Sequence, residues 1–198
     1  EFERADEYRN NKYFKQALDI EKSPSCSILR QRFNAIGDIQ SNLNDIKKLI
    51  DQTNLEILQN QNVELTPCHK KYVPLDIDVT PMDNSGSKKE GVSYTYKEFE
   101  GFAPIMAYIG TEGYLMKCEL REGKANGQCA KTVPFLKSTI ELAKQATQEP
   151  LLVRTDCGHD CCDNVLVFTQ KGVNFLMKKK NTVADKPEFY FKQGEKEG

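Results

Sequence analysis

The sequence predicts an α/β protein in which a mixed β-sheet flanked by helices follows a small helical N-terminal region. Residues 28–50 repeat apolar side chains every three or four positions, which indicates amphipathic helix. Residues 75–80 alternate apolar with acidic or hydroxyl side chains, which indicates a strand with one buried face. Beyond them, a meander of strands gives way to alternating helix and strand, a pattern that favours a sheet of mixed direction.

The first third of the chain predicts helices alone. Residues 1–22 are polar with scattered apolar positions and suit one or two short helices. Ser23-Pro24-Ser25 then offers capping hydroxyls and a proline where a new helix would begin. The apolar stripe follows, with Gly37 as a candidate break, and residues 54–62 extend it towards a turn at Thr66-Pro67. We therefore expect a helical region over 1–66 and the sheet domain over 67–198.

The elements of the sheet domain are predicted from strand and turn patterns. Strands are expected from the alternating, β-branched and aromatic segments, at 75–80, 93–96, 102–109, 114–120, 151–153 and 173–177. The second of them follows a polar loop over 81–91, and the turn at 111–113 makes a hairpin. One helix is expected between the Gly-rich loop 121–128 and Pro150, and another begins near Asp163-Asn164.

Composition limits the classes of function. The net charge is −1 and the sequence pI is about 6.2, so bulk charge does not indicate a nucleic-acid partner. DNA contact would depend on local basic groups, such as Lys178-Lys179-Lys180 or Arg30 with Arg32. Short basic runs are also common on ordinary solvated surfaces, and that interpretation stays open.

Features of membrane insertion or export are missing from the sequence. It contains no run of about 18 apolar residues, and its first residues are charged without an apolar h-region. The seven cysteines are odd in number and irregularly spaced. We therefore expect a cytoplasmic protein with reduced thiols.

Three aspartates lie at or near the ends of predicted strands. Asp76 and Asp78 share one face of the strand over 75–80, and Asp156 follows the strand over 151–153. Functional groups of open α/β sheets gather at the carboxyl ends of strands, and Mg²⁺ prefers oxygen ligands. Carboxylates there could share two metal ions for phosphodiester chemistry. The alternatives are an N-cap or turn role for Asp156 and a solvated edge for Asp76 and Asp78.

An ordered set of segments over roughly residues 6–180 resembles the DDE transposases of bacterial insertion sequences. The segments that carry the resemblance are Tyr8–Leu18, Pro24–Arg32, Leu75–Thr80, the loop with Gly86 and Glu90-Gly91, Tyr94–Ile109, Leu120–Asn126 and Leu152–Gly158. The resemblance implies the RNase H-like fold that these enzymes share with retroviral integrases. It also implies Mg²⁺- or Mn²⁺-dependent cleavage at transposon ends, followed by strand transfer to target DNA, in homodimers or larger assemblies.

Carried onto this sequence, the resemblance implies Asp78 as the first catalytic and metal-binding residue, with Asp76 as the rival, and Asp156 as the second. The third acidic residue of the family is a Glu on a downstream helix. Candidates here are Glu188, Glu195 and Glu197, which lie in a polar tail without a helical pattern. We therefore expect that carboxylate beyond Gly198, which would leave these 198 residues inactive by themselves.

The same resemblance suggests residues that contact DNA. Arg121 and Lys124 follow the predicted hairpin, where they would face the DNA backbone or serve as plain loop charges. Residues 23–36, with Arg30 and Arg32, would form a helix-turn-helix that reads transposon ends, or simply a packed amphipathic helix.

A cysteine and histidine cluster next to Asp156 offers a competing chemistry. Cys157, His159, Cys161 and Cys162 are zinc-ligand types without the CxxC spacing, and Cys68-His69 forms a distant second group. A cysteine nucleophile with His159 as its base is a further alternative. The function hypotheses are thus a DDE transposase, another RNase H-like nuclease with the same metal pair, and a non-catalytic zinc or DNA-binding module.

Overall fold

The computed structural model describes residues 4–61, 63–68 and 71–180. The chain divides into two compact units, Glu1–Gln52 and Thr53–Gly198, and helix α4 (Gln40–Asn60) runs across the division. The boundary expected between residues 66 and 67 stays a prediction.

The N-terminal unit contains the predicted helices. These are α1 (Ala5–Tyr8), α2 (Lys12–Ala17), α3 (Cys26–Gly37) and the first part of α4. Ser25 caps α3, since its side chain accepts a hydrogen bond from Ile28 N at 3.3 Å, and the helix ends at Gly37 as expected. Ile28 and Phe33, two members of the apolar stripe, are exposed. The choice between a packed and a DNA-reading helix therefore stays open.

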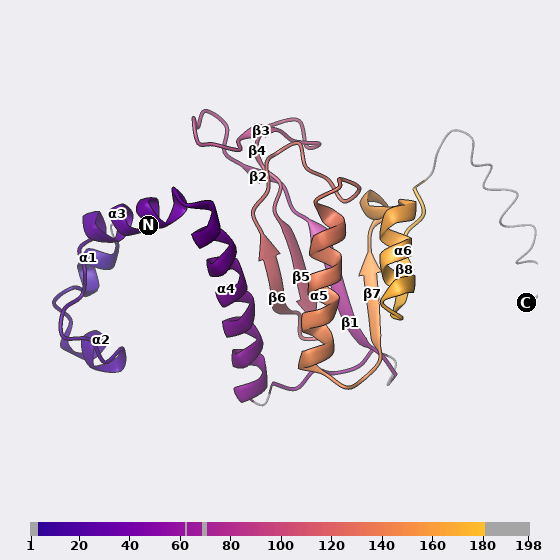
Figure 1. Cartoon of the computed structure of the whole chain (residues 1–198), viewed down its shortest axis with the longest axis horizontal. Helices are drawn as coiled ribbons and strands as arrows, with labels where there is room; N and C mark the ends of the chain where they lie inside the picture. The colour runs from indigo at the N-terminus through magenta and orange to yellow at the C-terminus, as the bar shows by residue number, and fades with distance from the viewer. Residues whose placement is uncertain (1–3, 62, 69–70, 181–198) are drawn as a thin grey trace, which may run out of the picture. The chain divides into compact units, whose positions relative to one another are not determined.

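The second unit is built on a five-stranded sheet with the order β6-β5-β1-β7-β8 (Figure 1). The central strand β1 (Val73–Val79) pairs antiparallel with β5 (Ile105–Ile109) and parallel with β7 (Leu151–Thr155). At the edges, β6 (Tyr114–Glu119) runs antiparallel to β5, and β8 (Asn174–Met177) runs parallel to β7. The mixed sheet confirms the expected α/β, RNase H-like fold class.

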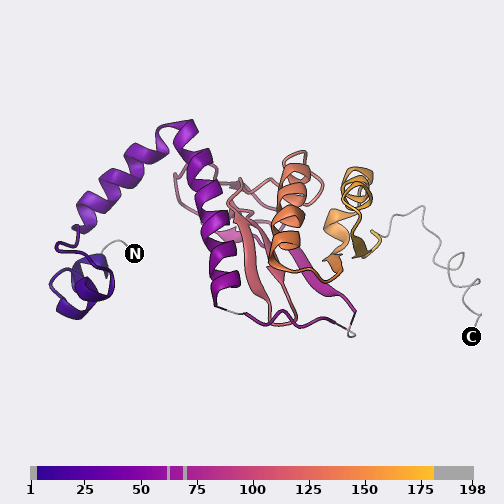
Figure 2. The same ribbon diagram turned by 60° about the horizontal axis from the view of Figure 1, so that its bottom comes forward.

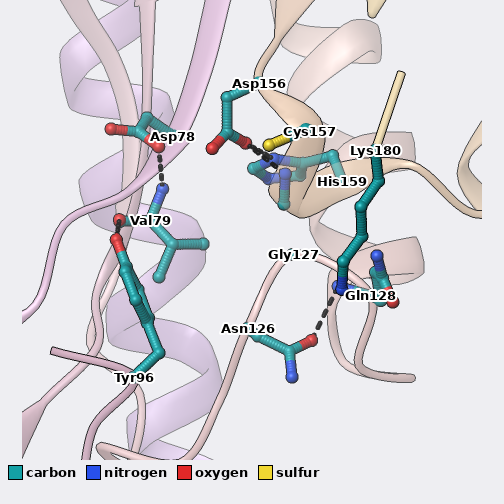
Figure 3. Close-up of a pocket in the computed structure, with 11 residues that line it drawn as sticks. Asp78, Val79, Tyr96, Asn126, Gly127, Gln128, Asp156, Cys157, His159 and Lys180 are labelled. Atoms are coloured by element: carbon teal, nitrogen blue, oxygen red, sulfur yellow. Dashed lines mark hydrogen bonds and ion pairs between the residues drawn. The ribbon is translucent and has the colours of Figure 1, made fainter. Parts of the chain in front are cut away.

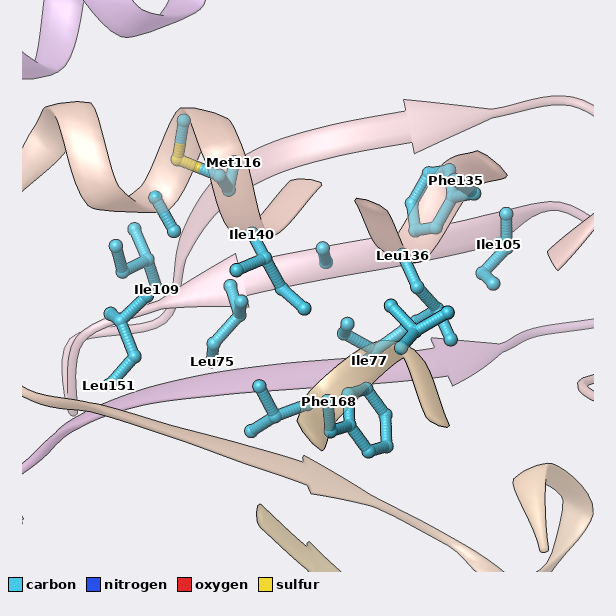
Figure 4. Close-up of a cluster of buried hydrophobic side chains, with 14 of the residues drawn as sticks. Leu75, Ile77, Ile105, Ile109, Met116, Phe135, Leu136, Ile140, Leu151 and Phe168 are labelled. Carbon is cyan, nitrogen blue, oxygen red and sulfur yellow. The ribbon is translucent and has the colours of Figure 1, made fainter. Parts of the chain in front are cut away.

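One face of this sheet forms the core. Along β1, Leu75, Ile77 and Val79 are buried, while Asp76 and Asp78 lie on the other, more accessible face, as the alternation predicts. Helices α5 (Thr132–Ala146) and α6 (Cys162–Gln170) cover the apolar face, as Figures 2 and 4 show. The apolar side chains that these helices contribute include Phe135, Leu136, Ile140, Val167 and Phe168. The functional groups are consequently left to the opposite face and to the strand ends.

The strand expected over 102–109 is wrong in one respect, because it is two strands in two sheets. β4 (Glu100–Phe102) pairs with β2 (Met82–Asp83) and β3 (Ser93–Tyr94) in a separate three-stranded sheet, so the predicted loop over 81–91 also begins with a strand. Pro104, which has no N–H to donate to a strand ladder, lies between β4 and β5. A Cβ on Gly101 would lie 2.0 Å from Met82 O, so only glycine allows β2 and β4 to approach so closely.

The predicted hairpin turn between β5 and β6 is confirmed. Gly110 and Gly113 have φ angles of +79° and +75°, which glycine adopts without strain. Glu112 fixes the turn to the segment before β1, since its carboxylate accepts a hydrogen bond from Thr66 N at 3.1 Å. Among the helices that the structure describes, none combines the length and apolar character needed to cross a membrane.

Candidate active site

Asp78 and Asp156 occupy equivalent positions at the carboxyl ends of two neighbouring strands. The parallel pairing of β1 and β7 places Ile77 opposite Thr155. The residues that follow these two along the sequence are Asp78 and Asp156. Neighbouring strands lie about 4.7–4.9 Å apart. Both aspartates are exposed, and both line one cleft of about 360 Å³ (Figure 3). The two carboxylates therefore meet at one end of the sheet.

Asp76, the rival for the first position, is engaged elsewhere. It lies opposite Arg154 in the same register. The Arg154 guanidinium donates a hydrogen bond to each carboxylate oxygen of Asp76, from Nε to Oδ1 at 2.5 Å and from Nη2 to Oδ2 at 2.6 Å. These hydrogen bonds to Asp76 raise the pKa of Arg154. Asp76 is not among the residues that line the cleft with Tyr96, although a second, more open cavity on the sheet face is lined by all three aspartates and by Arg154. A metal ion would have to displace Arg154 to use both oxygens of Asp76.

The carboxylates of Asp78 and Asp156 are each held by one oxygen. Oδ1 of Asp78 accepts a hydrogen bond from Val79 N at 2.8 Å, and Oδ1 of Asp156 accepts from Gly158 N at 3.0 Å. The second bond makes Asp156 the N-cap of a short 3₁₀ turn over Cys157–His159. Within the described part of the chain, Oδ2 of neither aspartate accepts a hydrogen bond, so one oxygen of each remains for a ligand.

Tyr96 forms another wall of the cleft. Its hydroxyl donates to Val79 O at 3.2 Å, and Lys97 Nζ lies 5.5 Å from the centre of its ring. Burial raises the pKa of the Tyr96 hydroxyl, and the nearby charges of Asp78 and Asp156 raise it further. The sequence does not distinguish Tyr96 from Tyr94, because only the fold of the loop after β3 brings one of them to the cleft.

The donor set of the cleft fits a hard divalent cation. Mg²⁺ is commonly held by one or two carboxylates, with water and substrate phosphate completing its shell. Over residues 4–61, 63–68 and 71–180, no group of three or more His, Cys, Asp or Glu side chains gathers as a metal site. The three cysteines and one histidine at 157–162 therefore do not gather into a zinc site by themselves. His69, of the second group, lies outside the described residues.

Among the described residues, His159 makes no hydrogen bond to a cysteine. It is buried, and its Nδ1 lies 3.0 Å from Oδ1 of Asp156. Its Nε2 is buried without a hydrogen-bond partner among the described residues. The seven cysteines, all in the described ranges, are free thiols.

Arg121, expected to contact DNA or to serve as a loop charge, is buried inside the protein, and its contact with DNA stays a prediction. Only 4% of the residue is exposed, and its guanidinium donates from Nε to Ala103 O at 3.3 Å and from Nη1 to Thr132 Oγ1 at 2.9 Å. Burial lowers the pKa of Arg121. The side chain thus ties the end of β6 to the start of α5 and is enclosed by the protein.

The other basic candidates are on the surface. Lys124 is exposed and pairs with Glu122 at 3.3 Å, and Arg30 and Arg32 are exposed on α3. Of the run at 178–180, Lys180 lines the cleft with Tyr96, and Lys178 lines the second cavity that Asp78 and Asp156 share. Glu188, Glu195 and Glu197 lie outside the described residues.

A family model described as transposase DDE domain group 1 matches residues 1–189. No curated protein matches the chain. Similar solved structures include the piggyBac transposase synaptic complex with hairpin DNA, at 14% identity and a TM-score of 0.41, over 63% of this chain and 26% of that chain. Another is the Mos1 transposase paired-end complex with left transposon end, at 13% identity and a TM-score of 0.34, over 96% of this chain and 67% of that one. The chain thus spans about a quarter of the length of the piggyBac transposase chain.

Proposed function

The chain belongs to the family of transposase DDE domains, group 1, and from that premise we propose that the full-length protein, to which this chain contributes Asp78 and Asp156, performs metal-dependent DNA strand cleavage and strand transfer at insertion-sequence ends. Asp78 and Asp156 are the proposed catalytic metal ligands. The observation that carries the proposal is their matching register at the ends of β1 and β7, in one cleft. Asp76 is assigned instead to Arg154, which holds both of its oxygens.

The chemistry needs a phosphate held at two carboxylates. A bound pair of Mg²⁺ or Mn²⁺ ions would activate the attacking oxygen and stabilise the leaving one. Val79 N and Gly158 N orient the two aspartates, each through one oxygen, and leave the other oxygen for the cations. Lys180, on the rim of the cleft, is suited to a phosphate oxygen because its ammonium group is a compact charge.

The proposed partner is double-stranded DNA, both transposon ends and target. Lys124 on the sheet unit and Arg30 and Arg32 on α3 are the proposed backbone contacts, since all three are exposed. Homodimers and a bacterial cytoplasmic location are parts of the same proposal, and they rest on the family.

The test compares Asp78→Asn and Asp156→Asn with a matched control, Asp76→Asn, which changes the same chemical group on the same strand face. Mn²⁺ binding is measured by electron paramagnetic resonance on the 198-residue chain, and cleavage of labelled terminal DNA on the complete gene product. We expect loss of both in the first two variants and near wild-type Mn²⁺ binding in the control.

Two results would change the assignment. Loss of Mn²⁺ binding in Asp76→Asn but not in Asp78→Asn would exchange the roles of the two aspartates. Cleavage without joining of the freed 3′ end to a second DNA would favour the alternative of an RNase H-like nuclease.

A further inference from the structure

His159 lies directly behind the proposed metal ligand Asp156 and is not used by the chemistry above. Only 1% of the residue is exposed, and its Nδ1 is 3.0 Å from Oδ1 of Asp156 (Figure 3). A carboxylate oxygen accepts hydrogen bonds, so Nδ1 is the atom that carries the proton and donates it. The other ring nitrogen, Nε2, is buried without a partner among the described residues, so a proton there would be stranded.

The ring is held in place by a buried framework. Gly127 packs against it so tightly that a Cβ at this position would lie 2.8 Å from the Cγ and Cδ2 atoms of His159 and 2.6 Å from Gly158 O. Asn164, on the first turn of α6 and 1% exposed, donates from Nδ2 to Gly127 O and to His159 O, at 2.8 Å each. One amide therefore connects the loop on one side of the ring to the backbone of the histidine itself.

This arrangement constrains the direction of the Asp156 carboxylate. Oδ1 accepts from two donors, the Gly158 N–H and the His159 ring, and rotation of the carboxylate would break both bonds. Oδ2 is consequently directed away from the protein framework. Partners of metal-binding side chains that lie behind the ligand fix its orientation and basicity in this way.

We propose that His159 is a positioning residue that holds Asp156 through Nδ1, so that Oδ2 is presented to the divalent cation. The inference rests on the proposed function. It assigns to the DCGH segment a role different from the zinc site or the thiol chemistry that its residue types suggest.

Two substitutions separate positioning from packing. His159→Asn keeps an N–H donor at the δ position, whereas His159→Leu fills similar space without any donor. Mn²⁺ affinity is measured by electron paramagnetic resonance on the 198-residue chain, and thermal unfolding is recorded for both variants. We expect affinity to fall about 10–100-fold in the leucine variant, as for other partners of metal ligands, and to stay within a few-fold of wild type in the asparagine variant. Wild-type affinity in the leucine variant, or an equal loss in both, would overturn the proposal.

A second measurement needs no metal and no variant that must fold. The chain contains two histidines, so long-range ¹H–¹⁵N correlation spectra resolve the tautomer of each ring. We expect His159 to carry its proton on Nδ1, and a proton on Nε2 would refute the proposed hydrogen bond. If the wild-type chain binds no Mn²⁺ while this tautomer is present, the proposed function fails and the positioning of Asp156 stands.

Discussion

Truncation of Arg121 to alanine tests whether this residue is structural or contacts DNA. Its two hydrogen bonds to oxygen, at Ala103 O and Thr132 Oγ1, come from a charged donor, and Nη1 also donates to Cys129 Sγ. Bonds of that kind contribute about 1.5–3 kcal/mol each. The side chain is desolvated, as the lowered pKa of its guanidinium reflects, and removing it relieves that cost. With the cavity that truncation leaves, we expect a net loss of about 2–4 kcal/mol in the free energy of unfolding.

Urea unfolding measures this loss directly. With a slope of about 2 kcal/mol/M, the midpoint of Arg121→Ala should fall by about 1–2 M. The matched control is Lys124→Ala, which removes an exposed basic side chain three residues along and should change stability by less than about 0.5 kcal/mol. Both variants are then titrated on terminal DNA at increasing salt, under conditions where each is folded.

The salt dependence separates the two roles. Loss of one phosphate contact reduces the slope of log K against log salt by about 0.9. We expect that reduction in Lys124→Ala and an unchanged slope in Arg121→Ala. The reasoning is refuted if Arg121→Ala keeps the wild-type urea midpoint and loses a unit of salt slope, because its guanidinium would then reach DNA.

Three further predictions concern the framework around the site. Phe168→Ala removes a fully buried ring and should lower the free energy of unfolding by about 3–5 kcal/mol in urea; a loss below about 1 kcal/mol would contradict the packing of α6 on the sheet. Arg154→Met breaks the ion pair with Asp76, in which each side chain is 41% exposed, so the free energy of unfolding should change by no more than about 1 kcal/mol. A larger loss would mean that the pair is better shielded from solvent than its exposure implies. Glu112→Gln should lower stability at neutral pH, because the hydrogen bond from Thr66 lowers the pKa of Glu112 in the folded protein. The contribution of the carboxylate is complete above its ordinary pKa of 4.5 and is lost as pH falls through the lowered value. Equal stability of variant and wild type at neutral pH would refute this prediction.

The sequence was sufficient wherever local patterns decide the structure. Alternation over 75–80 predicted which side chains of β1 are buried, and the Ser25 cap and Gly37 placed the ends of α3. The same alternation put Asp76 and Asp78 on one face but could not choose between them. That choice depends on the register with β7, which sets Arg154 opposite Asp76 and Asp156 next to Asp78.

Residue types alone left open the roles of groups whose environment comes from distant parts of the chain. Arg121 has the charge of a DNA contact, yet β4, β5 and α5 enclose it and supply partners for its guanidinium. His159 has the chemistry of a zinc ligand or a general base, yet Gly127 and Asn164 turn it towards Asp156.

By itself, then, the sequence determined the α/β order of elements, the buried face of the central strand and the family, because periodicity and ordered motifs are local properties of the chain. Only the tertiary structure decided which aspartate pairs with Arg154 and which basic group is buried. Strand register and burial arise from contacts between segments about 80 residues apart, as between Asp76 and Arg154, and no local pattern encodes them.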